Sequence, residues 1–365
     1  LQTHYKTYHG VADLYVYFVE KGVSLLKEGG LFSYIVSNKW LRANYGEPLR
    51  RWMKAQAIEE IVDFGDLPVF QQATTYPCIL RIGKGVKGKK PFFAANVKTL
   101  NFIDLGEYVE KNRRKIAVKS LDDKGWALTG AEEGALVSKI KSAGIPLGEY
   151  VGGEIYRGVL TGLNEAFVIG PETRERLIAQ DPNSKEMLKP FLAGRDIKRY
   201  QQPESEKYLI FTRRGMDIKQ FPAVEEYLTQ FKERLMPKPK GWNGGGWKGR
   251  KPGSYKWHEI QDTIDYYEEF EKPKIIFPDI STRGNFAFDR SNCYTANTTY
   301  IIPTTDFYLL GILNSNLVAF LYSRLSPSIR GGYFRFIFQY VSKLPIRVID
   351  FNNPKDKAVH DRIVS

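Results

Sequence analysis

The sequence predicts an α/β protein in two parts, the later half of a doubly wound sheet followed by a mixed α+β domain. Three observations lead to this prediction. The first eighty residues alternate between helical and strand-like patterns. Beyond residue 120 the chain changes to short strand-like runs with many glycines and aromatic residues. Its 365 residues are many for one domain and enough for two.

The first helix is expected to begin at Asp13, whose side chain can cap it, and to end at Gly29-Gly30. The spacing of four apolar residues predicts the buried face of this helix: Leu14, Phe18, Leu25 and Leu26. The run from Leu31 to Val36 is almost continuously apolar, which predicts a strand buried on both faces.

Helical pattern resumes from Asn38 to Met53, as one helix or two, with Pro48 near the start of the second part. Two further strands are expected at Ile58–Phe64 and Thr75–Ile82. Helix, strand, helix, strand, strand is the order of the later half of a doubly wound sheet. The front half, which carries the glycine-rich cofactor loop in such folds, is missing.

One glycine-rich match to G-x-G-x-x-G does occur, at Gly83, Gly85 and Gly88, with Asp104 about twenty residues later. The motif binds phosphate only where it opens a helix, and the Lys89-Lys90-Pro91 run that follows has no helical period. We therefore interpret this segment as a basic loop.

In the second part the pattern predicts a helix over Ala131–Ser142 and a turn over Ile145–Gly148. Strands are expected at Lys274–Phe277 and Tyr300–Ile302. A single helix is expected from Asp306 to Leu325, ending at Ser326-Pro327.

Composition excludes several classes of protein. With 26% charged and 42% hydrophobic residues, neither wholesale disorder nor a fibrous repeat is expected. The richest apolar run, 307–322, is interrupted by Asn314, Ser315 and Asn316, so we expect no membrane helix. The two cysteines exclude a disulfide framework and a zinc ribbon, and a cytoplasmic protein is expected. Because the first residue is Leu1, we expect the chain to be cut from, or to begin inside, a longer protein.

Basic residues are clustered. The formal net charge is +13, and residues 81–120 carry eleven Lys and Arg against three acidic residues. Residues 232–257 carry eight against one, and residues 324–347 carry five with no acidic residue. Clusters of this kind on a near-neutral body indicate a polyanion partner such as nucleic acid; solvated surface loops are the alternative.

The order of several short segments resembles that of an adenine-specific DNA methyltransferase of the TaqI-like and type IIG restriction-modification kind. In the first part these segments are Ala12–Glu20 (ADLYVYFVE), Leu25–Gly30 (LLKEGG), Leu31–Val36, Asn38–Leu41 (NKWL) and Val69–Pro77 (VFQQATTYP). In the second part, which resembles a TaqI-like specificity domain, they are Arg157–Phe167 (RGVLTGLNEAF), Leu188–Ile197 (LKPFLAGRDI), Glu271–Ile280 (EKPKIIFPDI), Leu313–Ser315 and Lys343–Ile346. The resemblance implies the later, Rossmann-like part of a catalytic domain over residues 1–120 and a target recognition domain over residues 121–365.

The resemblance also implies a reaction. Such enzymes transfer a methyl group from S-adenosylmethionine to the exocyclic amine of an adenine that has been rotated out of the duplex. An Asn-Pro-Pro-Tyr motif accepts hydrogen bonds from the amine, and an aromatic residue stacks on the other face of the base. By its place in the Val69–Pro77 segment, Phe70 is that second aromatic residue; a core Phe at a strand end is the alternative.

This chain departs from the family pattern in one decisive respect. It has no Asn-Pro-Pro-Tyr, and its one Asn-Pro pair, Asn353-Pro354, lies near the C-terminus. The cofactor motifs that precede that tetrapeptide are absent as well. We therefore expect that the chain alone binds S-adenosylmethionine poorly and does not methylate, and that no metal is needed.

The recognition domain offers several candidate contacts to duplex DNA. Residues 237–257 interleave Lys and Arg, including Lys248 and Arg250, with Trp and Tyr on a glycine-rich backbone. Such a loop can order on DNA, or it can be a solvated insertion. The other side chains that we expect to touch bases or phosphates are Arg157, Thr161, Arg195, Arg283 and Asn285, each of which can instead be a surface or structural residue.

A further candidate segment runs from Ser326 to Phe334. In the family this region inserts beside the position that the flipped base has left. Arg330, Tyr333 and Phe334 are then DNA contacts, while Gly331 and Gly332 allow close approach of the backbone. The alternative is a tight turn into the last strand.

Two other classes of function remain open. A non-catalytic specificity subunit would position methyltransferase and nuclease chains supplied separately, but it has no use for half a doubly wound sheet. An RNA-modifying enzyme is disfavoured because no RNA-binding module is recognisable. A nuclease site is not expected, since the sequence shows no paired carboxylates with a Lys, and no second His follows His258-Glu259.

Overall fold

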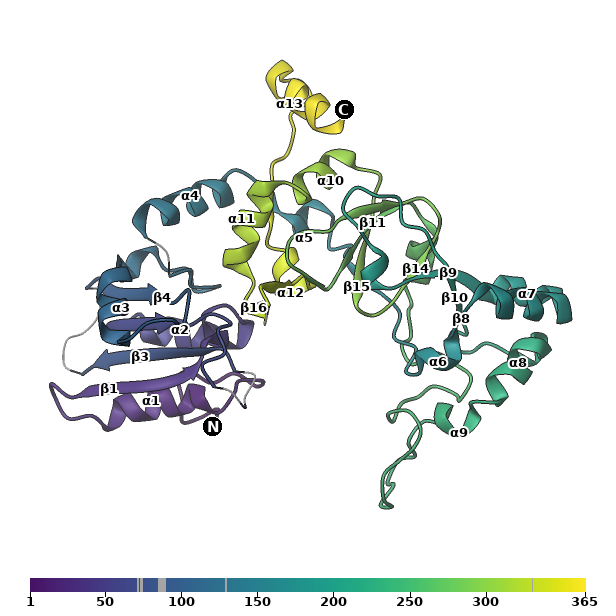
Figure 1. Cartoon of the computed structure of the whole chain (residues 1–365), viewed down its shortest axis with the longest axis horizontal. Helices are drawn as coiled ribbons and strands as arrows, with labels where there is room; N and C mark the ends of the chain where they lie inside the picture. Colours follow the sequence, from purple (N-terminus) through teal and green to yellow (C-terminus); the bar gives the residue numbers. More distant parts are fainter. Residues whose placement is uncertain (71, 73–74, 85–89, 129, 330) are drawn as a thin grey trace. The chain divides into compact units, whose positions relative to one another are not determined.

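The computed structural model describes residues 1–70, 72, 75–84, 90–128, 130–329 and 331–365. The chain forms two compact units, coloured along the sequence in Figure 1. The first unit contains Leu1–Leu147 and Asn316–Val348, and the second contains Gly148–Ser315 and Ile349–Ser365. The second unit is therefore inserted, in sequence, into the first. These units are defined by packing, so the division of function at residue 120 stays a prediction.

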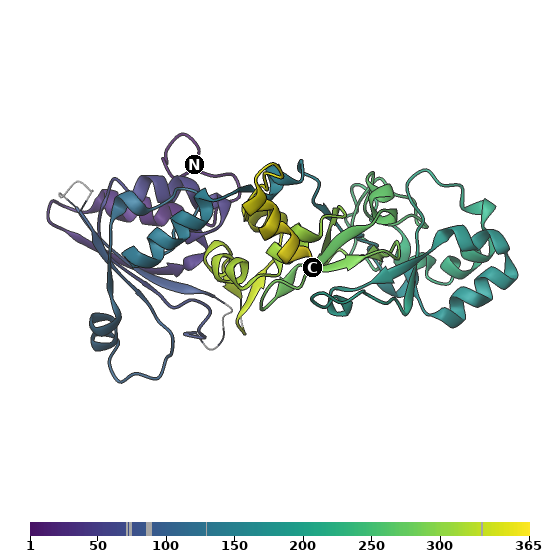
Figure 2. The same ribbon diagram turned by 90° about the horizontal axis from the view of Figure 1, so that it is seen from above.

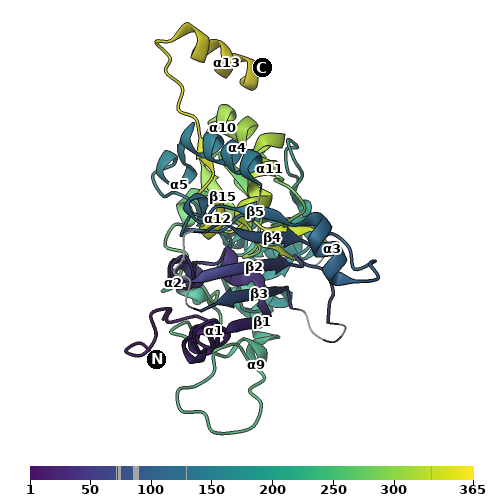
Figure 3. The ribbon, with the colours of Figure 1, turned by 90° about the vertical axis from the view of Figure 1, so that its left-hand side faces the viewer.

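A five-stranded sheet forms the centre of the first unit. Its strands are β1 (Leu31–Ser37), β2 (Ala57–Asp63), β3 (Pro77–Gly83), β4 (Phe92–Asn96) and β5 (Arg114–Ile116), in the order β1-β3-β2-β4-β5. Strand β3 is antiparallel to both of its neighbours, whereas β2 and β4 are parallel. Figure 3 shows the strands side by side in this order. The predicted α/β class is confirmed.

Helices and shorter strands surround this sheet. The α-helices are α1 (Tyr15–Leu25), α2 (Glu47–Met53), α3 (Leu105–Asn112), α4 (Ala131–Ser142), α11 (Asn316–Leu325) and α12 (Phe338–Val341). The 3-10 helices are η1 (Asn38–Leu41), η2 (Asn44–Gly46) and η3 (Val118–Ser120), and the short strands are β6 (Ile145–Pro146), β16 (Ser328–Ile329), β17 (Tyr333–Arg335) and β18 (Pro345–Ile346). The predicted α4 and the place of Pro48 at the start of α2 are confirmed.

The expected burial of α1 and β1 is wrong. Leu14, Phe18 and Leu25 are all more than half exposed, and the buried side of α1 is made by a different set of residues, Val16, Tyr17, Val19 and Val23. The Asp13 side chain does not cap this helix. In β1, Leu31, Tyr34 and Ile35 are exposed. Among the described strands, β1 lies at the edge of the sheet and pairs with β3.

A buried arginine joins irregular segments of the first unit. Arg50 of α2 donates from Nη1 to the carbonyl oxygens of Trp40 and Ala43, and from Nε to that of Asp123 at 2.7 Å. Burial lowers the pKa of its guanidinium to about 10, so it stays charged at neutral pH. Arg50 thereby fixes η1, η2 and the segment that carries Trp126, whose ring meets Trp40 edge-on.

Two four-stranded sheets form the second unit. One has the order β14-β9-β10-β8, from β14 (Tyr294–Thr295), β9 (Leu188–Leu192), β10 (Lys207–Ile210) and β8 (Val168–Ile169). The other has the order β13-β11-β15-β7, from β13 (Ala287–Asp289), β11 (Lys274–Pro278), β15 (Thr299–Pro303) and β7 (Tyr156–Arg157). The predicted strands at 274–277 and 300–302 are β11 and β15, which confirms a mixed α+β arrangement.

The second unit also contains short helices. They are α5 (Leu147–Tyr150), α6 (Asn164–Phe167), α7 (Pro171–Gln180), α8 (Pro222–Thr229), α9 (Lys232–Leu235), α10 (Phe307–Leu313) and α13 (Pro354–Val364), with 3-10 turns η4 (Pro182–Met187), η5 (Gly194–Asp196), η6 (Ile218–Gln220) and η7 (Tyr267–Glu271) and the small strand β12 (Ile280–Ser281). Helices α7 and α8 pack side by side (Figures 1 and 2). In the described part of the chain, no helix combines the length and apolarity that a membrane span requires.

Two predicted elements differ from the structure. The single helix over 306–325 is two helices, α10 and α11, separated at Asn314 and Ser315. The Asn314 side chain pairs with the backbone of Phe286, accepting from its N–H and donating to its carbonyl oxygen. Those bonds hold the break in place. The expected turn at 145–148 instead forms β6, paired with β18, and the start of α5.

A fully buried ion pair crosses from β11 to β13. Lys274 Nζ lies 2.6 Å from Asp289 Oδ2 and also donates to the carbonyl oxygen of Phe270. Asp289 accepts in addition from the backbone N–H groups of Ser291 and Cys293. Both charges are therefore matched by several partners, as a buried pair requires.

Replacing Lys274 by Met should lower the free energy of unfolding by about 3–5 kcal/mol, because Asp289 would stay buried without its cation. Urea unfolding followed by tryptophan fluorescence measures the loss. The matched control is Lys272→Met, which removes an exposed pair with Glu269 and should leave the midpoint nearly unchanged. Equal shifts in the two variants would contradict the role given to Lys274.

Candidate nucleic-acid interface

A rigid turn follows strand β2 in the first unit. Asp63, the last residue of β2, is buried and accepts hydrogen bonds from Asn38 Nδ2 at 2.7 Å and from the Gly65 N–H at 2.9 Å. Gly65 has φ +58°, a conformation that favours glycine. These contacts fix the direction in which the chain leaves the sheet toward Asp66 and Phe70.

Phe70 lies at the end of this loop with 45% of its surface exposed. A core Phe would be buried, so the exposure favours the first of the two readings of this residue. Gln71, Ala73 and Thr74 of the same motif lie outside the described residues. The stacking role of Phe70 stays a prediction.

The hairpin of β16 and β17 lies against the same loop. Gly331 and Gly332, both at positive φ, form its turn, and the Gly332 N–H donates to Asp66 Oδ2 at 3.2 Å. Tyr333 is 43% exposed, whereas the half-buried Phe334 meets Tyr322 edge-on. Arg330 lies outside the described residues. The structure thus brings together the loop and the hairpin, two segments that the sequence analysis had singled out separately.

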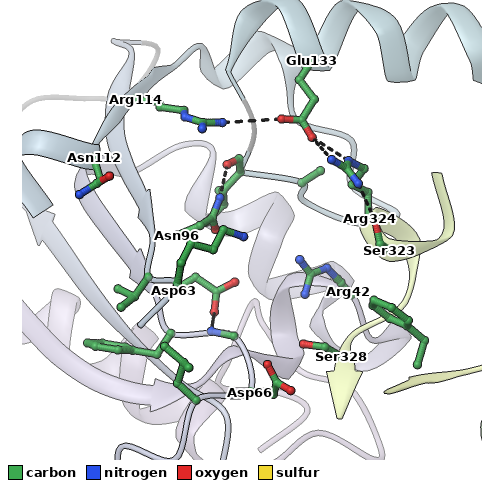
Figure 4. A pocket seen from close by; sticks show the side chains of 18 residues that line it. Arg42, Asp63, Asp66, Asn96, Asn112, Arg114, Glu133, Ser323, Arg324 and Ser328 are labelled. Carbon is green, nitrogen blue, oxygen red and sulfur yellow. Dashed lines mark hydrogen bonds and ion pairs between the residues drawn. The ribbon is translucent and has the colours of Figure 1, made fainter. Parts of the chain in front are cut away.

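A pocket of about 530 Å³ opens between the loop and the hairpin (Figure 4). It lies beyond the carboxyl ends of the parallel strands β2 and β4, which is where open α/β sheets bind ligands. Its polar lining consists of Arg42, Asp63, Asp66, Asn96, Lys98, Asn112, Arg114, Glu133, Ser323, Arg324 and Ser328. Apolar groups, among them Phe64, Leu67 and Phe334, complete the wall.

Most charges in this pocket are paired within it. Glu133 forms ion pairs with Arg324 at 2.5 Å and with Arg114 at 3.6 Å. Asp63 and Asp66 accept backbone N–H groups. Arg42 and Lys98 differ, because neither side chain has a hydrogen-bond or ion-pair partner among the described residues. Lys98 is exposed, whereas the Arg42 Nε is shielded from solvent, and Figure 4 shows the Arg42 guanidinium pointing into the pocket.

Two predicted DNA contacts of the second unit are buried. Arg250 is 4% exposed and donates to the carbonyl oxygens of five residues, namely Leu235, Thr161, Glu259, Lys256 and Trp257. Burial lowers the pKa of its guanidinium to about 10. Thr161 is 1% exposed and bonds to Asn164. These contacts argue for structural roles, since neither side chain has room for an outside partner.

The remaining predicted contacts are accessible. Arg195 is 77% and Lys248 79% exposed in their side chains, each in a loose ion pair with a neighbouring carboxylate. Arg157 and Arg283 are exposed, and Asn285 is half-buried. The Arg157 Nε is occupied by the carbonyl oxygen of Asn297 at 2.8 Å. Whether any of these side chains touches DNA stays a prediction.

Of the residues that line the pocket, sequence reasoning named Phe334 and missed the polar ones. Arg114 and Arg324 had been noted as members of basic stretches, and Arg42 follows a quoted motif directly, but nothing in the sequence placed them together. Asp63 and Asn96 carried a usable signal, since both are polar residues at the end of a strand.

Among the residues that the structure describes, no group of His, Cys, Asp or Glu is arranged to hold a metal ion.

Two family models match the chain. Residues 1–70 match the Eco57I restriction-modification methylase, and residues 189–346 match the TaqI-like C-terminal specificity domain. Among curated relatives, the type II methyltransferase M.PaeR7I of Pseudomonas aeruginosa is 24% identical over 94% of this chain and 60% of its own length. The type II restriction enzyme and methyltransferase RM.Eco57I of Escherichia coli is 22% identical over 99% of this chain and 39% of its own length. The chain thus spans well under two thirds of the length of these two proteins.

A solved structure shares the fold. The type IIL restriction-modification enzyme MmeI, determined in complex with DNA, superposes with a TM-score of 0.58 over 96% of this chain and 42% of MmeI, at 13% identity. At that identity the likeness concerns the fold alone.

Replacing Arg250 by Ala should lower the free energy of unfolding by about 3 kcal/mol, because five carbonyl oxygens lose a charged donor. Lys248→Ala is the control: it should leave stability unchanged and weaken binding of duplex DNA at low salt. Thermal unfolding and fluorescence anisotropy measure the two effects. A stable Arg250→Ala chain with weakened DNA binding would show that Arg250 contacts DNA after all.

Proposed function

We propose that this chain, which carries part of an Eco57I-type restriction-modification methylase and a TaqI-like specificity domain, recognises duplex DNA within a site-specific adenine methyltransferase. The methyl donor of that enzyme is S-adenosylmethionine, and its target is the exocyclic amine of an adenine rotated out of the duplex. The second unit reads the target site, and the first unit receives the flipped base.

The observation that carries this proposal is the exposed Phe70 at the end of the β2 loop. A Phe with 45% of its surface in water loses hydrophobic free energy unless a partner covers it. A nucleobase is such a partner, and stacking on an aromatic ring contributes about 1–3 kcal/mol. The hairpin bearing Tyr333 lies beside the same loop, bound to it through Asp66 and Gly332. Phe70 could then stack on the unpaired base, and Tyr333 could fill the gap that the base leaves in the duplex.

The chain does not supply a complete methyl-transfer site. It has no Asn-Pro-Pro-Tyr to hold the target amine, and its one glycine-rich match precedes strand β4 instead of a helix. No residue set described here fits S-adenosylmethionine, so no catalytic step through that cofactor is assigned to this chain. Residues outside this chain would provide the cofactor site and the groups that hold the amine.

The exposed apolar surface of the first unit supports the proposal that residues outside this chain provide the cofactor site. Leu14, Phe18 and Leu25 of α1 and Tyr34 and Ile35 of β1 all face solvent. Edge strands of this length and composition are normally paired or covered. A further part of a doubly wound sheet, carrying the missing motifs, would cover them.

A non-catalytic specificity subunit is the second candidate function. The basic and exposed side chains of the second unit suit it equally well. The five-stranded sheet and the exposed Phe70 of the first unit favour the methyltransferase, because positioning other chains on DNA requires neither. The two functions differ in whether the full-length protein methylates by itself.

The purified chain should bind duplex DNA with an affinity that falls steeply as salt rises from about 50 to 200 mM, because several phosphates are neutralised. It should show no methyl transfer from radiolabelled S-adenosylmethionine, since the motifs for cofactor and target amine are missing. Detectable methyl transfer by the chain alone would contradict the proposal that residues outside this chain provide the cofactor site. Absence of transfer by the longer protein would favour the specificity subunit.

In the longer, active protein, Phe70→Ala should reduce the rate of methylation by about 5- to 150-fold, which corresponds to the loss of one stacking contact. Binding of duplex DNA should change much less. Phe70→Trp is the matched control, because it retains an aromatic face and should restore most of the rate. Equal rates for the Ala and Trp variants would exclude stacking at this position.

A further inference from the structure

We propose that the pocket of the first unit binds one phosphate group of the DNA backbone, and that Arg42 is its principal ligand. This inference rests on the proposed function, because it needs a protein that binds duplex DNA. It adds a contact that the sequence motifs did not indicate and that belongs to the methylase-like unit instead of the specificity domain.

Arg42 is held in place by its neighbours. Its own N–H donates to the carbonyl oxygen of Lys39 at 3.1 Å. The carbonyl oxygens of Trp40 and Ala43, one on either side in sequence, both accept from the buried Arg50. The backbone that presents the Arg42 side chain to the pocket is therefore fixed before any ligand binds, which reduces the entropy lost on binding.

Two cations of this pocket, Arg42 and the exposed Lys98, have no acceptor among the residues that the structure describes, and of the two only Arg42 has a donor shielded from solvent. Asp63, Asp66 and Glu133 line the same space, yet none of them forms an ion pair with Arg42. A shielded donor without an acceptor is unfavourable, because it has lost its water without gaining a partner. An oxyanion would remove that cost, since the planar guanidinium offers two parallel donors to two oxygens of one phosphate.

The charge of the pocket matches a phosphodiester. Four basic side chains, Arg42, Lys98, Arg114 and Arg324, line it together with three acidic ones, Asp63, Asp66 and Glu133. One positive charge is left, and a phosphate within a DNA strand carries one negative charge. A free phosphate or a nucleotide polyphosphate carries more charge and would be repelled by the carboxylates.

The position of the pocket also suits a backbone phosphate. Asp66 lies four residues before Phe70, a distance of at most about 14 Å along the chain. A strand whose base stacks on Phe70 therefore has its neighbouring phosphates within reach of the pocket. Contacts to phosphates set the register of a protein on DNA, and a flipped nucleotide needs its backbone held in the rotated position.

The test uses fluorescence anisotropy of this chain with a labelled duplex of random sequence at several salt concentrations. Arg42→Gln should lower the slope of log K against log salt by about 1, the contribution of one phosphate, and weaken binding similarly for every duplex sequence. Arg42→Lys, which keeps the charge, should retain the slope. Arg51→Gln, which removes an exposed arginine of α2 that is paired with Glu47 and lies outside the basic stretches, should change neither slope nor affinity.

Three outcomes would overturn the inference. If the wild-type chain does not bind duplex DNA, the proposed function fails and this contact fails with it. If the wild type binds with a steep slope and Arg42→Gln leaves that slope unchanged, only the assignment of Arg42 is wrong. If inorganic phosphate raises the unfolding temperature of the wild type but not of Arg42→Gln, while the slopes agree, the pocket is a site for free phosphate.

Discussion

The packing of both units depends on three buried cations, Arg50, Arg250 and Lys274, that bind oxygen acceptors of the same chain. Arg50 in the first unit and Arg250 in the second are both surrounded by backbone carbonyl groups. Lys274 is buried against Asp289. Arg50 and Arg250 tie together short segments that lie between the longer helices and strands, such as η1 and η2 around Arg50. Without these cations, the carbonyl groups of those segments would be buried and unpaired, at a cost of about 1–3 kcal/mol each.

This matching also separates structural from binding residues among the many basic side chains. The net charge of +13 and the basic stretches suggested a polyanion partner, but a count of charges treats Arg250 and Lys248 alike. In the folded chain the first is enclosed by carbonyl groups and the second is exposed. Arg42 is different from both, because it is partly shielded and yet unmatched. Under the proposed function, the side chains open to DNA are those that the fold leaves accessible, such as Lys248, or unmatched among the described residues, such as Arg42.

Local patterns in the sequence predicted the elements well and their burial less well. Helices α2 and α4 and strands β2 and β3 follow from turn residues and periodicity, which act over a few positions. The burial of α1 and β1 was mispredicted, because apolar residues such as Phe18 and Ile35 were taken as the core of this chain alone. The pattern of apolar residues in a sequence does not tell which of them this chain buries by itself, and Phe18 and Ile35 face solvent here. The pocket was not predicted because Arg42, Asn96 and Arg324 are far apart in the sequence. They come together through the order of the strands in the five-stranded sheet and because residues 316–348 pack with the first unit.

Because residues 316–348 pack with the first unit, the order of the sequence motifs identified the β16–β17 hairpin but not the residues that it contacts. The match to the specificity domain covers residues 189–346, whereas the second compact unit ends at Ser315 before the chain resumes it at Ile349. Helix α11 and the β16–β17 hairpin therefore resemble the specificity family in sequence and pack with the methylase-like sheet in structure. The hydrogen bond between the Gly332 N–H and Asp66 joins two segments of the first unit, and so it does not depend on the structure of residues 148–315. If the proposed function holds, an exchange of target specificity that respects packing would replace residues 148–315 and leave the hairpin with the loop that carries Phe70.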